Sequence, residues 1–372
     1  MRRWIVGVGL CAMAVLAIVL APGRAPAVAP PAPPLWLVLI ATSATASGPA
    51  SESGLHLVEL TGGRLPPAVA RFAHLPDGAV RGALLPGSDA VLVVADRQQL
   101  APVRDGSFAG VLLRVEPGQG ARPLCDRVDH ASRPLVALGG RVFVGRGRPG
   151  PALPGAMRVD ALSIDEIDPV TGVEREVWRG RGFHASLAGA HGTELFIYQV
   201  TAGGASLLAV DPDSGATRTV LPSLLPFARD FVVSEGVLTF ATRDEARADR
   251  WVIDRVELAS GTRRRLLTAP GQHLAPHPWP GGDLAFDPGD GRGLRLLSGG
   301  RPELAGLGAG ADVVRAIAPE AARAALWHYV PGATHAEVRI VDARRGESRA
   351  VTASPATRLE IVGFSSDFRS WR

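Results

Sequence analysis

The sequence predicts an all-β fold, a seven-bladed β-propeller made of four-stranded antiparallel blades. Three observations lead to this prediction. The 372 residues include 44 Gly and 31 Pro, which divide the chain into many short apolar segments, as strands and turns require. A hexapeptide with an acid and a glycine at fixed positions recurs along the chain, and a series of strand-like segments recurs with it. The interval between copies, roughly 40 to 60 residues, is typical of a propeller blade.

The hexapeptide predicts the turn between the third and fourth strands of each blade. It consists of a β-branched residue, an acid, three variable residues and a glycine. The glycine supplies the positive φ at the end of a type I turn, and the acid accepts hydrogen bonds from free N–H groups of the turn. The copies are VELTGG (58–63), VEPGQG (115–120), IDPVTG (167–172), VDPDSG (210–215), VELASG (256–261) and VDARRG (341–346), with a degenerate seventh that ends at Gly300.

The strand-like segments predict how the ring closes. A turn and a further β-like segment precede six of them, whereas only the Pro-rich leader precedes the first, so the first blade lacks its innermost strand. Residues 357–372 supply such a strand after the last complete unit. We therefore expect the C-terminal strand to join the N-terminal blade. The segments span residues 35–40, 90–95, 141–146, 194–200, 237–243, 283–287 and 325–330.

At the level of the repeat, the chain resembles the TolB-like and WD-repeat propellers. The overlap of its two termini is similar to the ring closure of those families. GFSSDFRSW (363–371) resembles the FSPDG turn of the TolB-like repeat, with Phe368 in place of the glycine. The resemblance covers residues 35–372 and implies a seven-bladed propeller, but it brings no catalytic motif.

Two segments suggest other structures when they are considered alone. RAIAPEAARAALWH (315–328) has a helix-forming composition, although the repeat favours two strands joined by a turn at residues 319–323. Both interpretations stay open. GRGRPG (145–150) matches a dinucleotide-binding glycine pattern, but the prolines that follow exclude the required helix, so we expect a loop.

The N-terminus has the features of an export leader. Arg2 and Arg3 precede an unbroken apolar segment, which predicts a hydrophobic helix over residues 1–21, either a cleaved signal peptide or an uncleaved signal anchor. Residues 22–34 form an Ala/Pro-rich linker, and residues 35–372 form the propeller. The basic N-terminus stays inside, so we expect the propeller in the periplasm, elsewhere in the cell envelope or outside the cell.

The composition argues against several kinds of chemistry. The chain has no Lys and no Asn, so it has no Schiff-base lysine, no phosphate-loop lysine and no N-glycosylation site. Its net charge is +4 without a basic stripe, which argues against nucleic-acid binding. No G-x-S-x-G, H-E-x-x-H or C-x-x-C motif occurs, so no catalytic residue, cofactor or metal is predicted. Beyond the leader the only cysteine is Cys125, for which we expect a buried thiol rather than a nucleophile.

The predicted binding surface lies on the face opposite the acid–glycine turns. In a four-stranded blade, the middle loop and the connection to the next blade share that face, where variable loops carry function. The long loops 97–110 and 146–161 and the connection 125–133 belong to blades two and three and carry many charges. The candidate binding residues are Arg97, Arg104, Asp105, Asp126, Asp129, His130, Arg146, Arg148 and Arg158.

The repeats predict a complete propeller, the leader predicts that it is exported or anchored to the membrane, and the lack of catalytic motifs predicts that it is not an enzyme. We expect a monomer that binds a protein or peptide in the bacterial cell envelope and contacts the membrane only through its N-terminal segment. The alternative is a propeller enzyme, a metal-assisted hydrolase, lactonase or lyase, with acids and histidines at the mouth of the central channel. The histidine candidates are His184, His273 and His277.

Overall fold

The computed structural model describes most of the chain after residue 34. The chain divides into two units, Met1–Pro33 and Pro34–Arg372, and every described residue belongs to the second. The predicted leader and linker lie outside the described residues. Within the described part, no helix has the length and apolar character needed to span a membrane. The described residues are 35–44, 51–60, 70–75, 79–96, 110–129, 132–148, 160–247, 249–270, 275–279, 283–286, 295–298, 310–318, 322–333, 336–342, 345–351 and 357–367.

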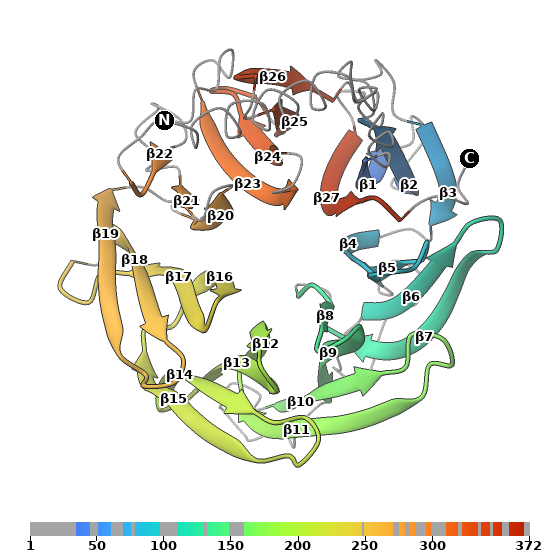
Figure 1. The fold of residues 1–372 in the computed structure, drawn as a ribbon. Helices are drawn as coiled ribbons and strands as arrows, with labels where there is room; N and C mark the ends of the chain where they lie inside the picture. Colours follow the sequence, from blue (N-terminus) through green and yellow to red (C-terminus); the bar gives the residue numbers. More distant parts are fainter. Residues whose placement is uncertain are drawn as a thin grey trace, which may run out of the picture. The chain divides into compact units, whose positions relative to one another are not determined.

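These residues form strands β1 to β27 and no helix (Figure 1). Three sheets contain four strands that pair antiparallel in chain order. Their strands are β12 (His184–His191), β13 (Glu194–Thr201), β14 (Gly204–Val210) and β15 (Thr217–Leu224); β16 (Arg229–Ser234), β17 (Val237–Arg243), β18 (Arg250–Glu257) and β19 (Arg263–Pro270); and β23 (Ala311–Ala318), β24 (Arg323–Tyr329), β25 (Glu337–Asp342) and β26 (Glu347–Ala350).

Two further groups of four strands form one continuous sheet, because a single residue pair, Val128 with Arg146, joins β7 to β9. A separate sheet has three described strands, β20 (His277–Trp279), β21 (Asp283–Phe286) and β22 (Arg295–Leu296). The strands of the continuous sheet are β4 (Ala79–Leu84), β5 (Val91–Asp96), β6 (Gly110–Glu116), β7 (Gly120–Val128), β8 (Leu135–Ala137), β9 (Arg141–Arg148), β10 (Asp160–Ile167) and β11 (Glu174–Gly182).

The last sheet joins the two ends of the unit. β27 (Thr357–Ser365) pairs antiparallel with β1 (Trp36–Ala44), and β2 (Ser51–Glu59) and β3 (Ala70–Leu75) complete the order β27-β1-β2-β3. The first strands of successive groups contact one another, from β27 to β4, β8, β12, β16, β20 and β23 and back to β27. Figure 1 shows these strands on the inner side of their sheets. They therefore bring together side chains from distant parts of the sequence.

The acid–glycine turns form as predicted where their glycines are described; Gly63 of the first copy and Gly300 of the degenerate seventh lie outside the described residues. In VDPDSG, the Asp211 carboxylate accepts hydrogen bonds from the backbone N–H groups of Ser214 (3.0 Å) and Asp213 (2.8 Å), which lower the pKa of Asp211. The described glycines of these turns have positive φ, between 63° and 79°. They are Gly120, Gly172, Gly215, Gly261 and Gly346.

Replacing the turn glycines with alanine is expected to lower the free energy of unfolding, by an amount that depends on how closely each turn packs against the next sheet. A Cβ on Gly215 would meet no atom within 4 Å, so Gly215→Ala carries only the backbone cost of positive φ, about 1–2 kcal/mol. A Cβ on Gly261 would lie 2.7 Å from the carbonyl oxygen of Val220 in the neighbouring sheet, so Gly261→Ala should cost more. Urea unfolding measures both losses. Equal losses would contradict the packing of this turn against the next sheet.

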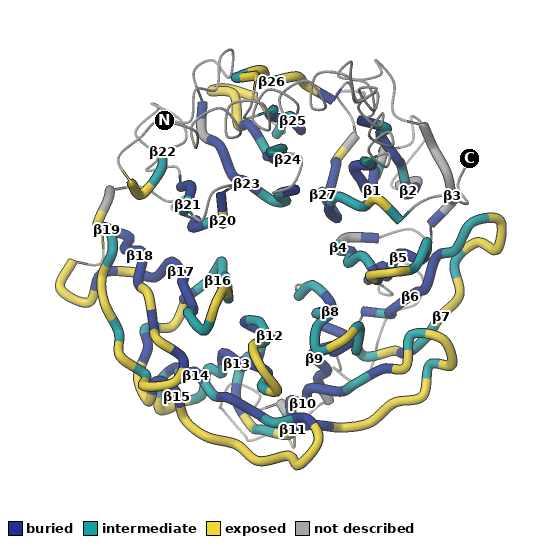
Figure 2. Tube along the Cα trace, in the orientation of Figure 1, coloured by how far each residue is buried: buried dark blue, intermediate teal, exposed yellow. Residues whose placement is uncertain are grey.

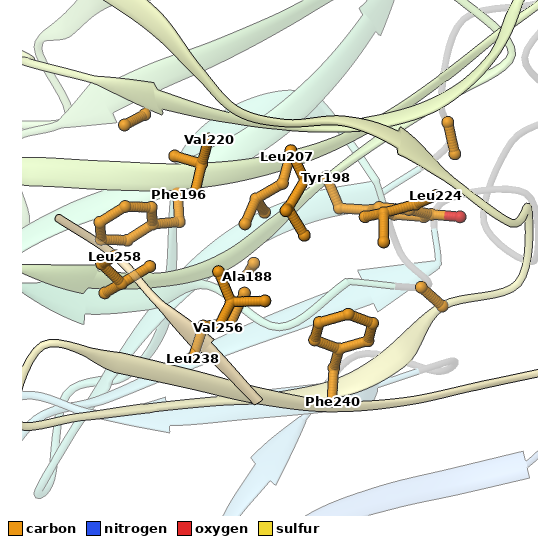
Figure 3. Close-up of a cluster of buried hydrophobic side chains, with 14 residues drawn as sticks. Ala188, Phe196, Tyr198, Leu207, Val220, Leu224, Leu238, Phe240, Val256 and Leu258 are labelled. Atoms are coloured by element: carbon orange, nitrogen blue, oxygen red, sulfur yellow. The ribbon is translucent and has the colours of Figure 1, made fainter. Parts of the chain in front are cut away.

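The core lies between neighbouring sheets. Figure 3 shows Phe196 and Leu207 of one sheet facing Leu238 and Phe240 of the next, in one cluster of buried side chains. Figure 2 shows that exposed residues concentrate in the turns and in outer strands such as β11 and β15. The second strands of their groups, such as β5, β13 and β17, are apolar runs because both of their faces are covered, whereas outer strands such as β11 and β15 mix buried and exposed residues.

A group of charged residues also links sheets. Glu166 of β10 accepts hydrogen bonds from Arg141 (2.8 Å) and Arg175, and these bonds, chiefly that of Arg141, lower its pKa to about 2. Arg141 also pairs with Asp213 of the VDPDSG turn at 3.0 Å. The second aspartate of this turn therefore contacts the preceding group of strands.

Two ambiguous segments have a definite structure. Within residues 315–328, strands β23 and β24 confirm the two-strand interpretation for the described residues. The expectation that GRGRPG is entirely a loop is wrong, because β9 continues to Arg148. Pairing with β10 extends the strand, since Ala161 lies opposite Arg148.

Candidate functional site

A pocket of about 530 Å³ opens between the sheets β12–β15 and β16–β19. Its walls come from the first residue of β12, the end of β13, the connection between β15 and β16, the end of β17 and the start of β18. Most of the lining is apolar, with two guanidinium groups and one imidazole. The lining residues are His184, Tyr198, Val200, Pro226, Phe227, Ala228, Arg229, Arg243 and Trp251.

Strand register explains why these residues meet. His184 lies opposite Val200 in the β12–β13 pair, and Arg243 lies opposite Trp251 in the β17–β18 pair. Both pairs are at the same end of their sheets as the β15–β16 connection. The acid–glycine turns occupy the other end, because antiparallel strands alternate in direction. The pocket therefore lies on the face predicted to carry function, although in different groups of strands from those predicted.

Aromatic rings and guanidinium groups form the pocket walls. The Arg229 guanidinium lies 4.0 Å from the centre of the Trp251 ring, and that of Arg243 lies 5.3 Å from it, both within the range of cation–π attraction. The Tyr198 hydroxyl donates to the Leu225 carbonyl at 3.3 Å, and burial raises the pKa of Tyr198, so its phenol stays neutral. The rings are thus fixed and offer a rigid apolar surface beside positive charge.

Phe227 stands out at the edge of the pocket. Its side chain is 71% exposed, and its backbone has φ 84°, a conformation that non-glycine residues rarely adopt. Both features cost free energy in the isolated chain, since an exposed phenyl ring gains no burial and positive φ adds strain. Such a combination is typical of a residue held ready for a contact outside the chain.

In a different group of strands, three arginines surround one buried carboxylate. Glu360 of β27 is 3% exposed and interacts with Arg133 at 2.7 Å, Arg81 at 3.1 Å and Arg315 at 4.0 Å. These arginines come from the segment before β8, from β4 and from β23. The Arg315 guanidinium also lies 4.4 Å from the centre of the Trp327 ring. We call these four charged residues the Glu360 cluster.

Asp230 and His277 adjoin this cluster. Burial raises the pKa of Asp230, although the guanidiniums of Arg229, Arg315 and Arg133 act to lower it. Burial, together with repulsion from Arg315 and Arg133, lowers the pKa of His277 to about 3, so its imidazole is neutral. Since Arg229 also approaches Asp230 at 3.4 Å, charged groups run from the pocket to the Glu360 cluster.

The predicted surface residues do not all lie in loops. Arg146 and Arg148, expected in a loop, lie in β9, and Asp126, expected in a connection, lies in β7. Arg146 is 5% exposed and pairs with Asp165 at 3.0 Å and Asp126 at 3.3 Å, so its charge is used within the sheet.

The remaining predicted residues have mixed positions. Asp129 is buried and accepts a hydrogen bond from the Ser132 hydroxyl at 2.7 Å. His184 lines the pocket, and His277 adjoins the Glu360 cluster. The binding role of the whole set stays a prediction. Those outside the described residues are Arg97, Arg104, Asp105, His130, Arg158 and His273.

The other side chains with reactive groups, Cys125, Asp312 and His328, are buried. Cys125 is buried, and burial raises its pKa to about 12, so the thiol stays protonated as expected for a structural residue. Asp312 and His328 form a buried pair at 2.8 Å, with both side chains almost completely covered. Among the described residues, no three His, Cys, Asp or Glu side chains are grouped so that they could hold a metal ion.

No protein-family model and no curated protein sequence matches the chain. Among solved structures, a puromycin-hydrolyzing peptidase from Mycobacterium tuberculosis is similar, with a TM-score of 0.55 and 18% identity over 85% of this chain. The acylaminoacyl peptidase of Pyrococcus horikoshii is also similar, with a TM-score of 0.55 and 11% identity over 85% of this chain. The fold is that of a β-propeller.

The propeller resembles TolB from Acinetobacter baumannii, with 9% identity, a TM-score of 0.49 and coverage of 88% of this chain and 66% of that chain. It spans 53% of the mycobacterial peptidase and 51% of the Pyrococcus peptidase, so it corresponds to about half of each. At these identities the likeness concerns the fold alone. Evidence for function therefore comes from the site itself, the pocket between the sheets β12–β15 and β16–β19.

Proposed function

We propose that the chain is an exported, seven-bladed β-propeller that binds a protein or peptide partner in the bacterial cell envelope and catalyses no reaction. The export part of this proposal is supported by the sequence of residues 1–34, with two arginines, an apolar segment and an Ala/Pro-rich linker. Either cleavage or anchoring would present the propeller outside the cytoplasmic membrane.

The blade number is supported by the contacts of the inner strands. Seven of them follow one another in a closed series of contacts, and β27 pairs with β1. Two of the seven blades would share the continuous sheet, through the pair of Val128 with Arg146. The three-stranded sheet would be the remaining incomplete blade.

The binding part of the proposal rests on exposed Phe227 beside an apolar pocket. Pockets of 300 to 1,000 Å³ are the usual size for ligand sites, and this one has about 530 Å³. Tyr, Trp and Arg are the residues that most often dominate binding energy at interfaces, and Tyr198, Trp251 and Arg229 line the pocket. We infer that the pocket receives an apolar or aromatic side chain of the partner, while Phe227 packs against its backbone.

Co-purification from the native cell envelope tests this proposal. The bait is the tagged full chain, as wild type, as Phe227→Asp and as Val170→Asp. Val170 is a matched control, since it is 62% exposed and lies in an acid–glycine turn at the opposite end of the sheets. A partner retained by wild type and Val170→Asp but reduced at least tenfold by Phe227→Asp is the expected result. The same proteins bound equally by all three baits would overturn the proposal.

The enzyme alternative depends on a metal ion near the predicted histidines. Burial and repulsion from Arg315 and Arg133 keep the His277 imidazole neutral, and the same two guanidiniums would repel a cation bound there. Metal analysis of the full chain purified without chelator separates the two functions. A stoichiometric divalent ion would favour the hydrolase, lactonase or lyase over the binding protein.

A further inference from the structure

We propose that the pocket binds the C-terminal residue of the partner, with its aromatic or aliphatic side chain between the pocket walls and its terminal carboxylate on the guanidinium of Arg243. This assignment rests on the proposed function and deepens it, because it names the residue of the partner that enters the pocket. The walls, the position of Arg243 and the charges around the pocket each support it.

The walls of the pocket suit an apolar side chain. Tyr198 and Trp251 are 3% and 6% exposed, so the surrounding core holds their rings in place. Tyr198 also packs against Phe231, with the ring centres 5.2 Å apart, and His184 meets it edge to face. Because these rings need no reordering, a side chain of the partner gains burial at little cost in conformational entropy.

Arg243 places a positive charge beside this wall. It is the last residue of β17 and lies opposite Trp251 of β18, so the two side chains share one face of the sheet. Its guanidinium lies 5.3 Å from the centre of the Trp251 ring. An arginine that lies against an aromatic ring still presents N–H donors at its edge, in a fork that matches the two oxygens of a carboxylate. Arg243 is exposed and lines the pocket, so a ligand from solvent reaches it directly.

The charges around the pocket favour an anionic ligand over a cationic one. Arg229 and Arg243 are both lining residues, and none of the described residues that line the pocket is Asp or Glu. Arg229 is half-buried and already interacts with Asp230 at 3.4 Å, whereas Arg243 is exposed. Arg243 is therefore the guanidinium that a ligand carboxylate meets first.

A C-terminal residue carries both groups that the pocket accommodates. Its side chain and its carboxylate are attached to the same Cα atom, so an apolar group and a negative charge arrive side by side. The Trp251 ring and the Arg243 guanidinium lie side by side in the pocket wall in the same way. Capture of a terminal carboxylate is a recurring mode of peptide recognition, and an internal residue offers no such charge on its backbone.

Isothermal titration of the purified full chain with three small probes tests the proposal. N-acetylphenylalanine has both the ring and the carboxylate, its amide lacks the charge, and N-acetylglycine lacks the ring. Wild type is expected to bind N-acetylphenylalanine saturably and at least tenfold more tightly than either of the others. A hydrogen bond to a charged group corresponds to a change in affinity of about tenfold or more.

Arg243→Gln should lower the affinity for N-acetylphenylalanine at least tenfold and leave the affinity for its amide unchanged, because only the charged contact is lost. Arg255→Gln is the matched control. Arg255 is 46% exposed in the same strand as Trp251, but it pairs with Glu257 at 3.1 Å at the acid–glycine end of that strand. The affinities of this control should equal those of wild type.

Equal affinity of wild type for the acid and the amide would overturn the carboxylate contact, yet it would leave the apolar pocket that the proposed function requires. An unchanged preference for the acid in Arg243→Gln would overturn the assignment to this residue. Tighter binding of N-acetylphenylalanyl-aspartyl amide would show that the charge comes from an acidic side chain after an internal aromatic residue, which also contradicts the proposal. So would the absence of saturable binding of N-acetylphenylalanine, whereas co-purification with Phe227→Asp decides the proposed function separately.

Discussion

Replacing Phe240 with alanine is expected to lower the free energy of unfolding by about 3–5 kcal/mol, the usual cost of removing a buried phenyl ring. Phe240 is 0% exposed and packs in the cluster between the sheets β12–β15 and β16–β19, where its ring centre lies 5.6 Å from that of Phe231. The loss combines the transfer free energy of the ring with an unfilled cavity. Urea unfolding followed by tryptophan fluorescence measures it.

The matched control is Phe227→Ala, which removes the same ring from a position that is 71% exposed. Its unfolding free energy should change by no more than about 0.5 kcal/mol, the usual range for surface positions. Similar losses at both positions would contradict the packing of the two sheets against each other.

Glu360→Gln is the second substitution with a large expected effect. It removes the negative charge that Arg81, Arg133 and Arg315 share, and breaking a buried ion pair in this way typically costs about 3–5 kcal/mol. The loss is measured by urea unfolding in chloride at low ionic strength. Glu194→Gln provides the comparison, because the Glu194–Arg218 pair is partly exposed and should contribute no more than about 1 kcal/mol.

An equal, small effect of both substitutions would mean that Glu360 does not hold the three arginines together.

Much of the fold could be predicted because it is encoded locally. The acid–glycine hexapeptide determines its own turn, as the hydrogen bonds of Asp211 and the positive φ of Gly215 show. Local spacing did not reveal that Asp213 contacts Arg141 in the preceding group of strands, because that contact depends on how two sheets pack.

The ends of strands were less predictable. Arg148 lies in β9 despite the glycines and prolines around it, because pairing with β10 continues beyond the apolar part of the strand. For the same reason the predicted loop residue Arg146 is buried among carboxylates. Sequence composition indicates which residues are polar, but strand register decides which of them face solvent.

The pocket and the Glu360 cluster are products of tertiary structure. Phe227 belongs to the connection between β15 and β16 and Trp251 belongs to β18, and only register and sheet packing bring them together. One signal was present in the sequence: Arg315 and Glu360 are each flanked on both sides by apolar residues, in VVRAIA and LEIV.

Site-specific photo-cross-linking in the native bacterium tests the binding function most directly. A photoreactive phenylalanine analogue replaces Phe227 at the pocket edge, or Val170 in the acid–glycine turn at the opposite end of the sheets, and both positions are exposed. The proposed function predicts a cross-link from position 227 to a defined envelope protein and none to that protein from position 170. No cross-link from position 227, or the same products from both positions, would contradict it.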